Sequence, residues 1–143
     1  MCPGRQFLAF LPIMARFLLL LLLFVAIVLE LTLTGGAFFA PAFTLGKFGV
    51  KYGPDTYFLG YLTGWFLLFV SAVAGLAFAW VWQRRPHFAA LCYLLGVWWM
   101  GIGVGIYVAF GKPDNLLLDT LKGLVLIFLA WRCRNGRMPV RRY

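Results

Sequence analysis

Four long apolar stretches constrain this chain more than any other feature of its sequence. They cover residues 17–34, 56–82, 88–110 and 116–131, and short segments that hold most of the charges separate them. A helix needs about 20 apolar residues to cross the hydrocarbon core of a bilayer. With 64% hydrophobic and 12% charged residues, the chain lacks the polar surface that a soluble domain requires. We therefore predict an all-α polytopic membrane protein, a four-transmembrane-helix bundle forming one domain over residues 1–143.

Turn-forming residues mark the boundaries between these stretches. The glycine pair at residues 35–36 is expected to end the first helix, the Gly-Pro-Asp turn at 53–55 to open the second, and the turn at 111–115 to separate the last two. Met14 is an alternative start, because it is followed by Ala-Arg and the first apolar stretch. A signal peptide cleaved near Ala37 is the competing interpretation of that stretch.

Basic residues are distributed unequally between the segments that flank the apolar stretches. Lys47, Lys51 and Lys112 fall on one side of the predicted bundle, and nine arginines fall on the other. Under the positive-inside rule, this distribution predicts that both termini are cytoplasmic, with an external loop at 35–55 and a basic cytoplasmic tail at 132–143. The nine are Arg5, Arg16, Arg84, Arg85, Arg132, Arg134, Arg137, Arg141 and Arg142.

Several classes of site lack their sequence signatures. The three cysteines, at positions 2, 92 and 133, have no CxxC spacing, and His87 is the only histidine. We therefore expect no disulfide framework, no metal site and no cofactor. No nucleotide-binding loop or nucleophile elbow is present, which favours a chain without its own catalytic centre. The net charge of +9 is interpreted as a topology signal with contacts to lipid headgroups, and no nucleic-acid partner is expected.

Three charged residues fall inside the predicted spans: Glu30 in the first, and Asp119 with Lys122 in the fourth. Counted from the external ends, all three lie at a similar depth, and Asp119 and Lys122 share a helical face because they are three residues apart. If the first and fourth helices are neighbours, Lys122 lies between two carboxylates. One hypothesis is a charge-compensated link between helices without chemistry. The other is a polar site for a lipid headgroup or a proton relay.

Aromatic residues near the middle of the third span suggest a second hypothesis for a ligand. Trp98 and Trp99 lie too deep for an interfacial belt, and a buried indole nitrogen requires an acceptor. Together with Tyr93 they are candidates to line a cavity for a flat lipophilic molecule. Bulky filling of the core opposite glycines explains them equally well.

Small residues recur four apart in the second and third spans, a spacing that lets helix backbones approach closely in lipid. We expect them to pack these two helices together, with a dimer seam as the alternative. The pairs are Gly60 with Gly64, Ser71 with Gly75, and Gly101 with Gly105.

The external segment at 35–55 carries five aromatic residues and is too apolar for a solvated linker. Residues 47–52 alternate basic or small with apolar residues, which predicts a short interfacial strand or hairpin arm. The segment is expected to anchor on the membrane surface or to form a lid above the Glu30 cluster.

In length, in its four-span layout and in Asp119 followed by Lys122-Gly123 near the start of the last span, the chain from 17 to 131 resembles small DoxX-like and BphX-like membrane proteins. The resemblance implies a small multi-pass protein of a bacterial inner (plasma) membrane and no particular reaction.

Small size and glycine-rich faces favour a non-catalytic accessory or assembly subunit of a larger membrane system, with membrane lipids and other membrane subunits as partners. The alternative is a binder, carrier or enzyme for a lipophilic substrate such as a quinone, isoprenoid, sterol or lipid, at the Glu30, Asp119 and Lys122 cluster. An ion or proton channel is a third candidate, although a monomer lacks charged residues for a continuous relay.

Overall fold

The computed structural model describes residues 4–135, with side chains from Ile13 onward. Every regular element between Gly4 and Asn135 is helical, which confirms the all-α class. The elements are α1 (Gly4–Phe39), α2 (Pro41–Lys47), the 3₁₀ turn η1 (Pro54–Thr56), α3 (Tyr57–Trp82), α4 (Phe88–Phe110) and α5 (Pro113–Asn135).

Three helical segments are long and apolar enough to cross a membrane, which supports an integral membrane protein. They are Ile13–Phe39, Pro54–Trp82 and Phe88–Phe110, with mean hydropathies of 2.8, 2.0 and 1.8. Helix α5 has the same 23-residue length as α4 but includes the charged residues Asp119 and Lys122. The residues beyond Asn135, which include most of the predicted basic tail, lie outside the described part of the chain.

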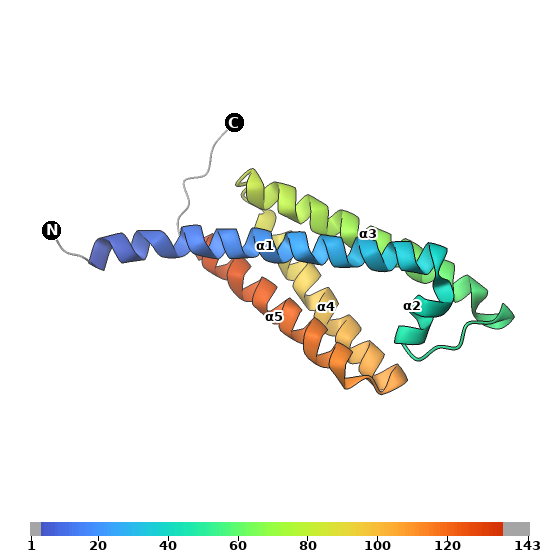
Figure 1. Cartoon of the computed structure of the whole chain (residues 1–143). Coiled ribbons are helices and arrows are strands. Elements are labelled where there is room, and N and C mark those ends of the chain that lie inside the picture. Colours follow the sequence, from blue (N-terminus) through green and yellow to red (C-terminus); the bar gives the residue numbers. More distant parts are fainter. Residues whose placement is uncertain (1–3, 136–143) are drawn as a thin grey trace.

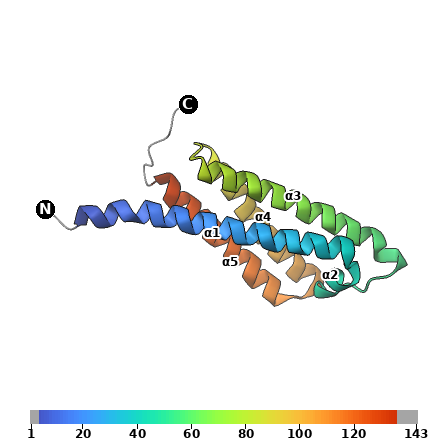
Figure 2. The same cartoon turned by 45° about the horizontal axis from the view of Figure 1, so that its top comes forward.

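The long helices form two antiparallel pairs arranged as a V. Helix α1 packs along α3 and α4 packs along α5, and the pairs meet at the α3–α4 turn and diverge toward α2 (Figures 1 and 2). We call these the closed end and the open end. The described chain begins and finishes at the closed end, where α1 extends beyond the bundle (Figure 1).

The apolar core occupies the half of the molecule next to the closed end. All four long helices contribute to it, and small side chains such as Ala74, Ala77 and Ala130 let them approach closely. The buried members are Ala15, Leu19, Leu23 and Ala26 of α1, Val70, Ala74, Ala77 and Val81 of α3, Cys92, Leu95 and Trp99 of α4, and Leu126, Leu129, Ala130 and Cys133 of α5.

Helices α4 and α5 come into backbone contact at glycines. A Cβ atom added at Gly123 would collide with the carbonyl oxygen of Gly96, and one added at Gly96 would lie 2.9 Å from the carbonyl oxygen of Gly123. Farther along, a Cβ at Gly103 would lie 3.1 Å from the carbonyl oxygen of Asn115. The turn between the helices uses Gly111 in the left-handed conformation (φ 64°), which caps α4. Gly96, Gly103 and Gly123 therefore set the spacing of this pair.

The glycines singled out from the sequence play different roles from the one expected. Gly60 faces Pro41 of α2, and Gly64 faces the ring of Phe38 on α1. These two glycines of α3 therefore contact α2 and α1, and neither contacts α4. No atom of the described chain lies within 4 Å of a Cβ added at Gly75, Gly101 or Gly105. Ser71 is buried, yet its hydroxyl has no partner among the described residues. At none of these five glycines does the second span pack closely on the third, because spacing alone does not say which face meets a neighbour.

The segment between the first two spans also differs from its prediction. Helix α1 continues through residues 35–36 and ends at Phe39. Gly36 lies against Thr44 of α2, whose hydroxyl oxygen is 2.6 Å from the position of an added Cβ, so this glycine leaves room for α2. The expected strand at 47–52 does not form. Pro41 instead starts α2, and the amides of residues 48–50 bond back to its last turn. In an all-helical chain, a strand has no neighbour with which to exchange hydrogen bonds.

Arg16 ties the two helices of the first pair together at the closed end. Its guanidinium donates hydrogen bonds to the carbonyl oxygens of Val81 (3.3 Å) and Trp82 (2.8 Å), in the last turn of α3. A cation is favourable there because the C-terminal carbonyls of a helix carry partial negative charge. The other four arginines of this end are Arg84, Arg85, Arg132 and Arg134, and all four are exposed.

Candidate functional site: a charged cluster where the helix pairs diverge

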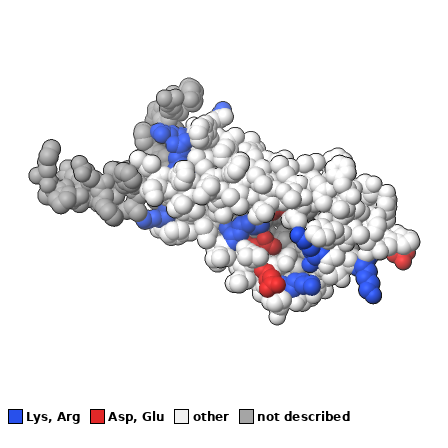
Figure 3. Space-filling view, viewed as in Figure 1, with Lys and Arg blue, Asp and Glu red and all other residues white. Residues whose placement is uncertain are grey.

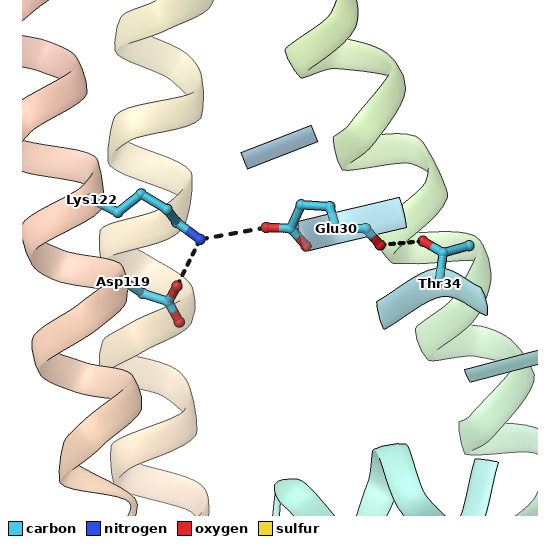
Figure 4. Close-up of polar contacts among 4 residues, drawn as sticks. All are labelled: Glu30, Thr34, Asp119 and Lys122. Carbon is cyan, nitrogen blue, oxygen red and sulfur yellow. Dashed lines mark hydrogen bonds and ion pairs between the residues drawn. The ribbon is translucent and has the colours of Figure 1, made fainter. Parts of the chain in front are cut away.

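The structure brings Glu30, Asp119 and Lys122 together, with Lys122 between the two carboxylates (Figure 4). The Lys122 ammonium lies 2.9 Å from Asp119 Oδ1 on its own helix and 3.5 Å from Glu30 Oε1 on α1. Because α1 and α5 belong to different pairs, the longer of these contacts joins the two arms of the V. We refer to these three residues and Trp99 as the Lys122 cluster.

Trp99 forms the floor of the Lys122 cluster. The ammonium of Lys122 lies 4.4 Å from the centre of the Trp99 ring, a cation–π contact. Trp99 is 2% exposed, and its position between Gly96 and Gly103 on α4 turns it toward α5. Its indole N–H has no hydrogen-bond partner in the described chain. A buried donor without an acceptor is costly, and such groups are rare.

The three charged side chains of the cluster differ in their exposure to the surroundings of the protein. The Glu30 side chain is 8% exposed, whereas the side chains of Asp119 and Lys122 are 19% and 20% exposed. Figure 3 shows acidic and basic side chains gathered around a hollow on the side of the molecule near α2 and α5, while most of the surface around them is uncharged. A polar group arriving from outside therefore meets Lys122 and Asp119 first and Glu30 last.

The position of the cluster follows from the extent of the core. The last buried core residues toward the open end are Ala26, Val70, Trp99 and Leu126, and Glu30 and Lys122 each lie one helical turn beyond. Farther out, the pairs diverge and α2 lies across the opening, with Thr44 against Gly36 and Leu45 near Gly60 (Figure 1). Charged residues thus begin where four-helix apolar packing ends.

The charges of the cluster do not cancel. Two carboxylates share one ammonium, which leaves one excess negative charge when all three groups are ionised. Glu30 contacts Lys122 through Oε1, and Figure 4 shows its second oxygen free of such contacts. In general, a charged side chain at the centre of a membrane-spanning helix costs roughly 2.5–3.5 kcal/mol on insertion scales. The arrangement is therefore less well balanced than a simple ion pair.

Thr34 was not singled out from the sequence. Its hydroxyl donates to the carbonyl oxygen of Glu30 at 2.7 Å, one turn earlier on α1 (Figure 4). This bond satisfies a buried hydroxyl on the face that carries the cluster. The i, i+4 spacing of Glu30 and Thr34 is the signal that indicates a shared face.

Of the three aromatic residues predicted to line one cavity, only Trp99 joins the cluster. Trp98 is 39% exposed and packs on Phe66 of α3, with ring centroids 5.1 Å apart. Tyr93 is partly buried against the core nearer the closed end. Adjacent residues on a helix point about 100° apart, so Trp98 and Trp99 cannot both face α5.

No group of three or more histidine, cysteine or acidic side chains with metal-binding geometry occurs in the described residues. Comparisons with known protein families, with characterised proteins and with solved structures find no match to this chain. The resemblance to DoxX-like and BphX-like proteins therefore stays a prediction, and any proposal of function depends on the cluster itself.

Proposed function

We propose that the chain binds a lipophilic molecule whose polar end sits at the Lys122 cluster while its apolar body lies between the diverging helix pairs. The observation that carries this proposal is the partly exposed, charge-unbalanced cluster with a buried, unpartnered indole N–H at its floor. A link serving only to hold helices together needs neither an excess charge nor an unsatisfied donor. Both features are what a site awaiting a polar ligand group presents.

The proposed membrane arrangement places all four long helices across the bilayer, with the closed end and both termini on the cytoplasmic side of a bacterial inner membrane. The positive-inside rule supports this orientation, since five arginines with described side chains lie at the closed end and Lys47, Lys51 and Lys112 lie toward the open end. Single cysteines introduced at Gln83 and at Asp55 in a cysteine-free variant test it. Only the Asp55 position should react with an impermeant thiol reagent added to intact cells.

Co-purification tests the proposed binding. The protein is extracted from its native membrane in mild detergent, and retained lipids are identified by mass spectrometry. We expect one lipophilic species to be enriched over bulk lipid in the wild type and in Trp98→Phe, a control outside the cluster. The same species should be depleted in Glu30→Gln and Trp99→Phe at equal yield of folded protein. Equal lipid profiles in all four proteins contradict the proposal.

A second candidate function is a non-catalytic accessory subunit, and the outer face of α4 favours it. Gly101 and Gly105 have open space beside them, and the neighbouring Val97, Val104 and Val108 are exposed. Such a face suits close approach of a partner helix. Mild-detergent purification from the native membrane should then yield a stoichiometric partner that Gly101→Leu removes. A lone monomer counts against this candidate.

A further inference from the structure

We infer that the polar end of the ligand is a neutral hydroxyl group, so that the molecule bound at the Lys122 cluster is a lipophilic alcohol. This inference rests on the proposed function and narrows it to one chemical class. It follows from which hydrogen-bonding groups of the cluster are already engaged and which remain.

Two buried groups of the cluster keep hydrogen-bonding capacity, and they are complementary to each other. The second oxygen of Asp119 also lies outside the contact with Lys122, but this side chain is 19% exposed and lies on the accessible side. The Trp99 indole N–H is a donor without a partner, and the second carboxylate oxygen of Glu30 is an acceptor outside the contact with Lys122. Both groups border the Lys122 ammonium, which lies 4.4 Å from the centre of the Trp99 ring and 3.5 Å from Glu30 Oε1. A ligand group seated between them must accept one hydrogen bond and donate another. A hydroxyl is the smallest group that does both.

The other common headgroups fit less well. A phosphate or carboxylate adds negative charge to a cluster that has one negative charge in excess when all its groups are ionised, and Lys122 already contacts two carboxylates. An ammonium group donates to Glu30 but cannot accept from Trp99, and an ether or quinone oxygen accepts from Trp99 but cannot donate to Glu30. Each of these ligands would leave either Trp99 or Glu30 without a hydrogen-bond partner. A buried group left unpaired costs free energy, so the cluster should bind them more weakly than an alcohol.

Four probes with the same 16-carbon chain test this inference: hexadecanol, its methyl ether, hexadecyl phosphate and hexadecylamine. Binding of each to delipidated full-length protein in nanodiscs is measured by native mass spectrometry. We expect hexadecanol to bind about tenfold more tightly than each of the other three, since a hydrogen bond to a charged group is at stake.

Variants separate the two hydrogen bonds. Glu30→Leu, which leaves the Asp119–Lys122 pair neutral, should lower the affinity for the alcohol about tenfold and leave that for the ether unchanged. Trp99→Phe should weaken alcohol and ether alike, by roughly fivefold, because both accept from the indole. Trp98→Phe should change neither. Thermal melts verify that each variant is folded, and Glu30→Met, which also removes the acceptor oxygens, replaces Glu30→Leu if the latter unfolds.

Four outcomes overturn the inference. Equal binding of alcohol and ether to the wild type refutes the hydroxyl group while leaving the proposed lipophilic site intact, as does tightest binding of the phosphate or the amine. An alcohol preference that survives Glu30→Leu refutes the assignment to this carboxylate. Absence of saturable binding by all four probes refutes the proposed function together with the inference.

Discussion

The closed half and the open half of the V are held together by different kinds of interaction. In the closed half, four helices share an apolar core rich in alanine, and Arg16 bonds the final carbonyls of α3. In the open half, the pairs are linked through Lys122 and Glu30, and the short helix α2 lies across the gap (Figure 1). The closed half therefore depends on fit between small side chains, and the open half depends on a few polar contacts.

This contrast indicates which half of the molecule is suited to hold a functional site. Packing of small apolar residues in lipid depends on close fit and places no charged side chain where a ligand could reach it. A charged cluster at the limit of the core is costly to the fold, since each buried charge must be compensated. Single substitutions in both halves test that contrast, and their expected effects on the free energy of unfolding range from about 3 to about 0.5 kcal/mol.

Replacing Lys122 with Met should be the most destabilising change. It leaves Glu30 and Asp119 without their shared counterion, and breaking a buried pair from one side costs about 3 kcal/mol. The free energy of unfolding in detergent micelles, measured against denaturant, should fall by about that amount.

The matched controls for Lys122 are Glu30→Gln and the double variant Glu30→Gln/Lys122→Met. Glu30→Gln leaves the neutral Asp119–Lys122 pair, so it should cost much less than Lys122→Met. The double variant should be more stable than Lys122→Met alone. If both single variants lose the same stability, the cluster acts as a simple link and the charge imbalance has no role.

Gly123→Ala should be the next largest change, because the added Cβ collides with the backbone carbonyl of Gly96 and lies 2.7 Å from the Met100 side chain. Overpacking of this kind costs about 2 kcal/mol. Gly101→Ala on the open face of α4 is the control, with an expected change near zero and a slight gain in helix propensity. Equal melting temperatures of the two variants would disprove the close α4–α5 contact.

Arg16→Met should have a smaller effect, confined to the closed end. It removes two hydrogen bonds to the carbonyls of Val81 and Trp82 but keeps the length of the side chain. A loss of about 1 kcal/mol is expected, and hydrogen exchange should increase in the last turn of α3. Exchange in α4 and α5 near Gly96 and Gly123 should stay at the wild-type rate, and a uniform increase would contradict a local role.

Gly36→Ala should change global stability least, by about 0.5 kcal/mol, because its added Cβ meets only the hydroxyl end of Thr44. We expect α2 to be displaced from the opening, so that a cysteine placed at Asp119 reacts faster with a lipid-soluble thiol reagent in a cysteine-free background. Thr44→Ala removes the colliding atom and should restore the original rate in the double variant. An unchanged rate in Gly36→Ala would contradict the position of α2 over the cluster.

Much of the site could be predicted from the sequence, and its surroundings could not. The shared depth of Glu30, Asp119 and Lys122 follows from counting along apolar stretches, since a helix has a constant rise per residue. The choice of Trp99 over Trp98 as the aromatic partner could not be predicted. Both lie in a span that is apolar all round, and such a span carries no amphipathic signal to indicate its inward face.

The packing glycines illustrate the same limit. The spacing of Gly101 and Gly105 is typical of a helix interface, yet Gly96, Gly103 and Gly123 make the close contacts. Gly96 and Gly103 are seven residues apart, a repeat that falls on one helical face but belongs to no short motif. A glycine permits close approach without specifying the partner.

The helical class, the apolar stretches and the few charges among them follow directly from the order of the amino acids, because bilayer thickness and the cost of buried charge act on composition alone. The pairing of α1 with α3 and of α4 with α5, the divergence of the pairs just beyond the core, and the position of Lys122 over Trp99 arise from packing in three dimensions. In lipid, helix association is decided by surface fit between apolar faces, and that fit exists only once the faces meet.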